Sequence, residues 1–168
     1  MAVSEMLTHM EQLLVLHDAL LEASEGKRQA IVANQVDQLA AWTSKESRLM
    51  KQVTERQSLW RDAVAAFLAS RGMKPTSSLT TAQIADMIAP GREKDRLNHL
   101  QEQLLGRIQE LKANIGRNQR LIEKSLEVIN YSVDLLYGDN EQESVYHNPA
   151  QTSHSASGAR NIRFDTRA

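Results

Sequence analysis

The chain has 168 residues, with 20 Lys and Arg against 21 Asp and Glu, and a formal net charge of −1. Such a balance lacks the positive field on which nucleic-acid or anionic-lipid binding usually depends, so we expect neither partner. The chain has no cysteine, which excludes disulfides and thiolate metal sites. Aromatic residues make up 4% of the chain while helix-favouring residues are frequent, a composition that predicts an all-α fold.

The first predicted helix covers about residues 3–28. One apolar helix face is indicated by residues that follow one another at steps of three and four: Met6, Met10, Leu13, His17 and Leu20. The pattern is interrupted near Gly26, and Asn34 is a suitable N-cap for the next helix. The segment has no basic cluster before its apolar residues, and no run in the chain is long and apolar enough to cross a bilayer. We therefore expect a cytoplasmic protein without membrane insertion.

A second, long helix is predicted over about residues 35–70. Its heptad-like apolar positions are Val36, Leu39, Met50, Val53, Trp60, Val64 and Phe67. A helix of this length would extend roughly 54 Å at 1.5 Å per residue, so it needs a partner along its length. Gly72 and Pro75 then stop the helix.

A short connecting helix is predicted over about residues 80–88, because Thr80 and Gln83 have the spacing of a capping box and Pro90 closes the segment. The last helix is predicted over about residues 92–137. It has the strongest periodicity in the chain, carried by Leu97, Leu100, Leu104, Ile108, Leu111, Ile115, Ile122, Ile129 and Leu136.

The expected architecture is therefore all-α. Three long helices form an elongated antiparallel coiled-coil hairpin or bundle, in which helices 35–70 and 92–137 match their seams and the short helix lies at the turn. Residues 1–137 are expected to form one helical domain. Residues 138–168 are too polar to offset the entropy of ordering, so we expect a disordered tail, in which Asn161–Asp165 could be a docking motif.

The end of the last helix carries more apolar surface than one partner helix can cover. One stripe consists of Ile122, Leu126, Ile129, Val133 and Leu136, and a second consists of Leu121, Val128 and Leu135. Either both stripes are buried under the first and second helices, or one remains available for the helices of another protein.

Catalytic and metal-binding residues are not indicated. His9 and His17 lack a Glu or His partner at the spacing of a metal site in a helical bundle, so we expect no metal and no cofactor. A helical-bundle enzyme or phosphatase would need a buried carboxamide or carboxylate cluster, for which Asn118 and Gln119 are the only suggestive pair. We therefore expect a protein that is not an enzyme.

Several local sequences resemble a known family. They are an Asn34–Leu39 entry to the second helix, the Lys45–Glu46 pair, the run Asn118–Ile122 that leads into Ser125–Ile129, and Leu136–Tyr137–Gly138 before a tail rich in Ser and Gly. Their order is similar to that of the FlgN-type flagellar export chaperones, which escort hook-associated (hook-filament junction) proteins to the type III export apparatus.

The resemblance implies that the last helix binds the terminal helices of hook-associated proteins. The implied client-binding residues are Asn118, Gln119, Leu121, Ile122, Leu126, Val128, Ile129, Val133, Leu135 and Leu136. It also implies that Tyr137, or alternatively Tyr146, docks on the cytoplasmic domain of the export gate. A coiled-coil structural, stalk or adaptor component of the same apparatus is the alternative function, and a homodimer is a further possible state.

Overall fold

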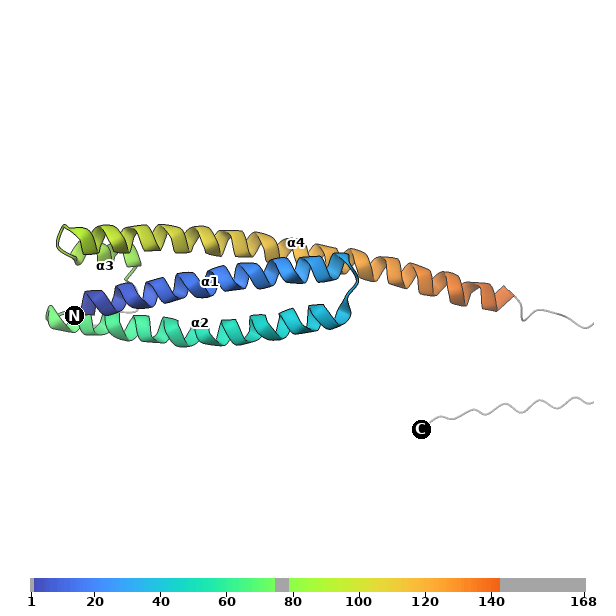
Figure 1. Cartoon of the computed structure of the whole chain (residues 1–168), viewed down its shortest axis with the longest axis horizontal. Coiled ribbons are helices and arrows are strands. Elements are labelled where there is room, and N and C mark those ends of the chain that lie inside the picture. Colours follow the sequence, from blue (N-terminus) through green and yellow to red (C-terminus); the bar gives the residue numbers. More distant parts are fainter. Residues whose placement is uncertain (1, 75–78, 143–168) are drawn as a thin grey trace, which may run out of the picture. The chain divides into compact units, whose positions relative to one another are not determined.

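The computed structural model describes residues 2–74 and 79–142, and side chains as far as residue 136. The described part contains four helices and no strand: α1 (Ala2–Val32), α2 (Val36–Ser70), α3 (Thr81–Met87) and α4 (Arg92–Gln142) (Figure 1). The predicted all-helical character is confirmed. The chain divides into two compact units, residues 1–128 and 129–168. None of the described helices has the length and apolar character required to cross a membrane.

Helix α1 continues through Gly26 to Val32, four residues beyond the predicted end at about residue 28. Gly26 does not interrupt the helix. Its lack of a side chain allows another helix to pack closely at this position. A Cβ atom at this position would lie 2.2 Å from Cε2 of Trp42 in α2, so the absence of a side chain lets the indole lie against the α1 backbone.

The turn between α1 and α2 is closed by Asn34, whose φ of 54° is in the left-handed region. The backbone N–H of Gln35 donates to the carbonyl of Ala30 (2.9 Å) and that of Asn34 to Ile31 (3.2 Å). This pair of bonds is a Schellman motif, in which Asn is tolerated after glycine. Asn34 therefore ends α1; the N-cap of α2 is Gln35, which makes no side-chain capping bond.

Helix α2 ends in the same kind of motif as α1, here with the glycine, Gly72, that the sequence predicts as its stop. Gly72 has a φ of 72°, and the N–H of Met73 donates to the carbonyl of Leu68 (3.0 Å), as expected for a glycine after the last helical residue. Helix α3 begins with the predicted capping box: Thr80 and Gln83 bond reciprocally. These local signals fix both sides of the connection between the long helices.

The core of residues 2–128 runs along α1. One cluster of buried residues joins all four helices and includes Met6, Met10, Phe67, Leu68, Ile84, Leu97 and Leu100. A second cluster follows along α1 and α2 with Leu13, Leu20 and Val53, against which Leu104 and Leu111 of α4 pack. His17 is buried beside this cluster, with its Nδ1 atom 2.7 Å from the carbonyl oxygen of Leu13.

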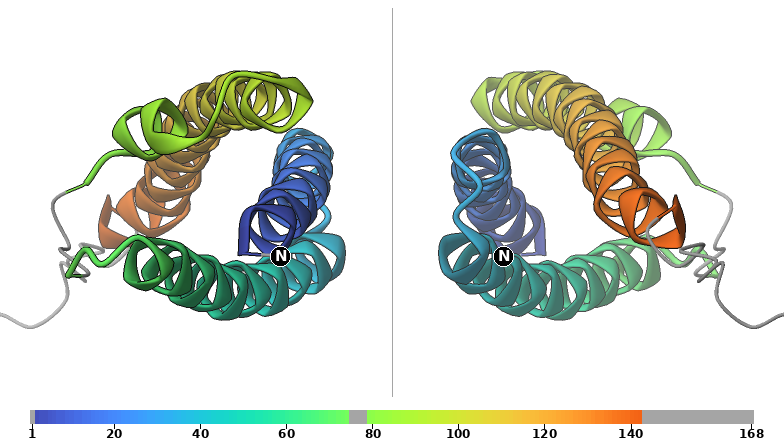
Figure 2. Two further views of the ribbon diagram at one scale, coloured as in Figure 1. Left: turned by 90° about the vertical axis from the view of Figure 1, so that its left-hand side faces the viewer. Right: turned by 90° about the vertical axis from the view of Figure 1, so that its right-hand side faces the viewer.

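Within this unit, α1 lies between α2 and α4 (Figures 1 and 2). Of the described helices, only α1 and α2 approach each other closely along their backbones. Helix α4 is attached to α1 by side chains: Arg107 pairs with Asp18 (2.6 Å) and Arg96 pairs with Glu11. The expected seam between the second and last helices is present in part: α2 and α4 share the first buried cluster, and α1 contributes Met6 and Met10 to the same cluster.

Helix α4 extends to Gln142, five residues beyond the predicted end at residue 137. The expected tail therefore begins, in the described part, with helical backbone over residues 138–142. The remainder of that expectation, residues 143–168 with the Asn161–Asp165 motif, lies outside the described residues.

Candidate protein-binding surface

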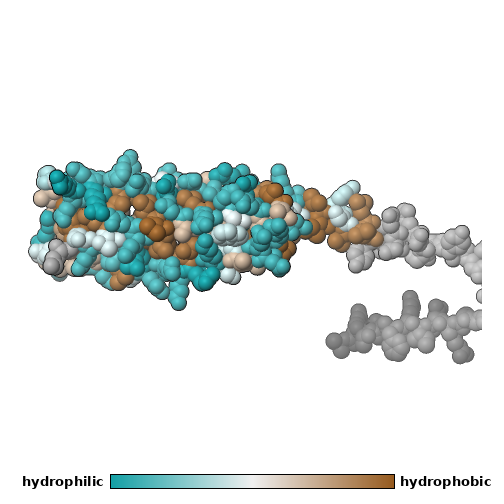
Figure 3. All heavy atoms as spheres, viewed as in Figure 1, coloured by the Kyte–Doolittle hydropathy of each residue, from teal (hydrophilic) through white to brown (hydrophobic). Residues whose placement is uncertain are grey.

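Helix α4 has a buried face and an exposed apolar face in the first unit. Leu97, Leu100 and Asn118 are buried, and Leu104, Leu111 and Leu121 are half-buried. Ile108, Ile115 and Ile122 each follow a residue of that face by four positions, about 40° further around the helix. With Leu105 and Leu126 they form a row that remains exposed or half-buried. We call this row the α4 stripe. Hydrophobic side chains are visible at the surface along α4 in Figure 3.

The exposure of the α4 stripe is large for apolar side chains. Leu105 is 51% exposed, Ile115 48% and Leu126 53%. Single exposed apolar residues are ordinary, but a contiguous row on one helix face usually marks an interaction surface. Ile122, Leu126 and Val128 are exposed. The chain's own helices therefore do not bury both apolar stripes over residues 122–128 of this unit.

The predicted client-binding residues of the first unit have different surroundings. Ile122, Leu126 and Val128 are exposed, and Leu121 is half-buried. Gln119 is exposed and its Nε2 donates to Oε1 of Glu123 (3.2 Å). These residues offer apolar surface with a polar margin.

Asn118 differs from the rest of the set. Its side chain is buried, and Nδ2 donates to the carbonyl oxygen of Ser24 in α1 (2.9 Å). A buried amide with a partner holds the two helices in register, because breaking that bond would leave a polar group unsatisfied. Asn118 therefore anchors α4 to α1, a role different from the client contact that the family resemblance implied.

In the second unit, described by itself, residues 129–142 are helical. Its predicted client-binding residues are all exposed: Ile129, Val133, Leu135 and Leu136. Tyr137 belongs to this helix, but its side chain lies outside the described side chains, and Tyr146 lies outside the described residues. Gate docking by either tyrosine stays a prediction.

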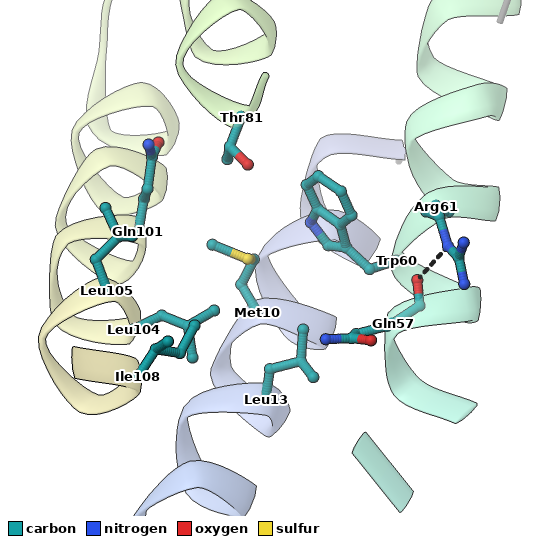
Figure 4. Close-up of a pocket in the computed structure, with 10 residues that line it drawn as sticks. All are labelled: Met10, Leu13, Gln57, Trp60, Arg61, Thr81, Gln101, Leu104, Leu105 and Ile108. Atoms are coloured by element: carbon teal, nitrogen blue, oxygen red, sulfur yellow. Dashed lines mark hydrogen bonds between the residues drawn. The ribbon is translucent and has the colours of Figure 1, made fainter. Parts of the chain in front are cut away.

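A groove opens between α2 and α4 in the first unit (Figure 4). It has a volume of about 420 Å³, and its lining comes from all four helices: Met10 and Leu13 of α1, Gln57, Trp60 and Arg61 of α2, Thr81 of α3, and Gln101, Leu104, Leu105 and Ile108 of α4. Since α1 forms the floor while α2 and α4 form the walls, we call it the α2–α4 groove. The groove was not predicted from the sequence. The spacing of Leu105 and Ile108 is the one feature of the sequence that could have indicated apolar surface here.

A second, smaller hollow of about 310 Å³ lies near the α1–α2 turn. Ile115, Ile122 and Gln119 of α4 line it together with an ion pair between Lys27 Nζ and Glu46 Oε2 (2.6 Å). Lys45–Glu46 was one of the local sequences that suggested the family; Glu46 bridges α2 to α1, and the Lys45 ammonium lies 4.7 Å from the centre of the Trp42 ring. Both side chains thus stabilise the turn end of the bundle.

The electrostatics near this end are dominated by Glu25. Arg28 donates to both of its carboxylate oxygens (2.8 and 2.5 Å), and Gln29 donates to one (3.2 Å). Hydrogen bonds from Arg28, then from Gln29, lower the pKa of Glu25 from 4.5 to about 2, and the same carboxylate raises the pKa of Arg28. The cluster is a charged surface feature on α1 and not a reactive pair.

Within the described residues, no three His, Cys, Asp or Glu side chains are grouped so that they could hold a metal ion. What the described surface offers is apolar area on a long helix, next to a groove between helices. This arrangement is typical of helical protein-binding modules, a class of protein whose ligands are often helices of a partner.

Comparison with known proteins identifies the family. The model of the family described as "FlgN protein" matches residues 1–154, so the chain belongs to the FlgN family of flagellar chaperones. It is 29% identical over 136 residues to the "Uncharacterized protein YvyG" of Bacillus subtilis (strain 168), an alignment that covers 81% of each chain. No solved structure matches.

Proposed function

We propose that this chain is a cytoplasmic export chaperone of the flagellar type III secretion pathway that binds hook-associated proteins through the end of α4. The observation that carries the proposal is the exposed α4 stripe from Ile122 to Leu126 in the first unit, together with the exposed apolar side chains over residues 129–136. The family match supports a flagellar chaperone, and the exposed side chains supply a surface for its client.

The physical basis is temporary cover for assembly helices. A secreted protein that polymerises outside the cell must keep its apolar assembly helices from associating early, and the uncovered face of another amphipathic helix provides matching surface. Two exposed rows support this role, since Leu126 and Val128 lie on different sides of α4. One client helix on each row would cover most of the circumference.

Delivery requires a second contact. We propose that Tyr137, next to the proposed client-binding residues, docks on the cytoplasmic domain of the export gate, with Tyr146 as the alternative. Its position on α4 is one residue beyond Leu136, so the proposed gate contact is adjacent to the proposed client contact. Replacing each tyrosine by alanine and measuring binding of the loaded chaperone to the isolated gate domain separates the two residues.

The client site is tested by Leu126→Asp and Ile129→Asp, singly and together, in co-purification with hook-associated proteins of the same bacterium. A charge in the apolar contact should weaken binding by at least tenfold per substitution, since burying an unpaired carboxylate is costly. Asn130→Asp is the matched control, because it adds the same side chain at an exposed position that belongs to neither apolar stripe. Undiminished binding by a helical double variant contradicts the site.

A further inference from the structure

The α2–α4 groove is incompletely filled. Leu105 on its α4 wall is 51% exposed. On its α2 wall, Nε1 of Trp60 is buried and has no hydrogen-bond partner among the described residues. A buried donor without an acceptor is unfavourable. Both features indicate that the groove is not fully satisfied by the chain's own side chains.

The groove is continuous with the proposed client surface. Leu105 and Ile108 line the groove, Ile115 and Ile122 line the hollow near the α1–α2 turn, and Leu126 ends the row in the first unit. The 21 steps along the helix from Leu105 to Leu126 correspond to roughly 32 Å. A partner helix of about six turns could therefore follow the α4 stripe along this whole length.

The charge of the residues at the groove favours an occupant with acidic side chains. Arg61 lines the α2 wall, and Lys112 lies one helical turn beyond Ile108 on the α4 stripe. Both are exposed, and neither takes part in an ion pair with another described residue. Near the turn, by contrast, Lys27 already offsets Glu46. Arg61 is thus the one charged side chain among the described residues that line the α2–α4 groove, and it is positive.

Resting on the proposed function, we propose that the α2–α4 groove is a second binding site for the client. Its occupant is an amphipathic client helix that lies along α4 between Leu105 and Leu126, with acidic residues next to Arg61 and Lys112. The helix completes a four-helix arrangement with α1, α2 and α4 and covers the indole of Trp60. The client is then held at two places on α4 and not only at its end.

Occupation of the groove is tested at Trp60. The chain has two tryptophans, so Trp42→Phe leaves Trp60 as the only one, and labelling the chaperone with 5-fluorotryptophan gives one ¹⁹F resonance that no tryptophan of the client can obscure. Titration with the hook-associated protein that co-purifies with the full chain should shift this resonance in step with binding. An unchanged resonance in the saturated complex overturns the groove assignment.

Affinity provides the second test. Leu105→Glu and Arg61→Glu should each weaken client binding on the order of tenfold, and the effect of Arg61→Glu should diminish at high salt. Leu59→Glu and Arg48→Glu are matched controls on α2, since both residues are exposed and neither lines the groove. Circular dichroism confirms that each variant remains helical, and Arg61→Glu carries the test alone if Leu105→Glu unfolds the chain.

The outcomes separate the two proposals. If Leu126→Asp abolishes binding while both groove variants bind like the unaltered chain, the proposed function stands and the groove inference fails. If the unaltered chain binds no hook-associated protein, the proposed function fails and the inference with it. Sedimentation of the free chain adds a third result: a dimer that Leu105→Glu dissociates would assign the groove to a second copy and overturn the client assignment.

Discussion

Gly26 shows how a single residue can be misread from its type alone. A glycine inside a helix usually costs about 1 kcal/mol relative to alanine, which is why the sequence pattern suggested the end of a helix near this point. The indole of Trp42 occupies the space that a side chain would need. The same residue therefore stabilises the contact between α1 and α2 instead of ending α1.

Gly26→Ala should destabilise the protein for this reason. Overpacking against the indole costs about 1–3 kcal/mol, which exceeds or cancels the roughly 1 kcal/mol gained in helix propensity. Gly116→Ala in α4 is the matched control: nothing lies within 4 Å of the added methyl, so this variant should gain stability. Urea unfolding followed by circular dichroism measures both, and a stabilised Gly26→Ala variant contradicts the packing role.

The carboxyl group of Glu25 should titrate with a pKa of about 2 in the folded protein. Hydrogen bonds from Arg28, the first cause, and from Gln29 favour the ionised form. Because the pKa in the folded state is lowered from 4.5, the pair contributes stability above pH 4.5 that is lost as the pH falls toward 2. The contribution is small, since both side chains are exposed.

Carbon-detected NMR of the side-chain carboxyl measures this pKa directly. Arg28→Gln removes the main donor and should return the pKa of Glu25 toward its ordinary value. A pKa of Glu25 near 4.5 in the unaltered chain would show that the Arg28 contact does not persist in solution.

At the scale of elements, helix ends with a local mechanism were predictable from the sequence. Gly72 stops α2 and the Thr80–Gln83 box starts α3, because each depends on residues within one turn. Asn34 was assigned to the wrong helix end: Asn serves both as an N-cap and as a left-handed residue after a helix, and only the backbone conformation distinguishes these roles. The extension of α1 to Val32 depended on packing that no local pattern contains.

Thr80→Ala should weaken α3 at its start. The side chain accepts from the N–H of Gln83 (3.3 Å), while the N–H of Thr80 donates to Oε1 of Gln83 (2.8 Å). Loss of such a cap costs about 1 kcal/mol, and amide hydrogen exchange at Gln83 should accelerate. Thr54→Ala, an exposed threonine inside α2, is the control and should change stability little. Unchanged exchange at Gln83 in the Thr80 variant would show that the core residue Ile84 alone holds α3.

At the scale of the whole molecule, the sequence predicted the helices and the surplus of apolar surface on α4. It did not predict how α1, α2 and α4 pack against one another. The excess at Ile122 and Leu126 could be read from spacing, since it exceeds what one neighbour can bury. The internal role of Asn118 could not, because a polar residue in an apolar pattern has the same appearance whether it faces Ser24 or a client. Trp60 and Leu105 are 45 positions apart in the sequence, so the α2–α4 groove required the fold.

The placement of α1 between α2 and α4 gives the most demanding prediction. A variant that begins at Gln35 retains both helices that the sequence analysis paired, but lacks Met6, Met10 and Leu20, which are buried in the cores that α2 and α4 share with α1. Exposing those apolar faces removes most of the free energy that stabilises either helix, because long helices in water depend on tertiary packing. We expect reduced helicity, no cooperative thermal unfolding and aggregation in size-exclusion chromatography. A cooperatively folded variant that still binds the client would show that α2 and α4 can pair directly, as the heptad pattern alone suggested.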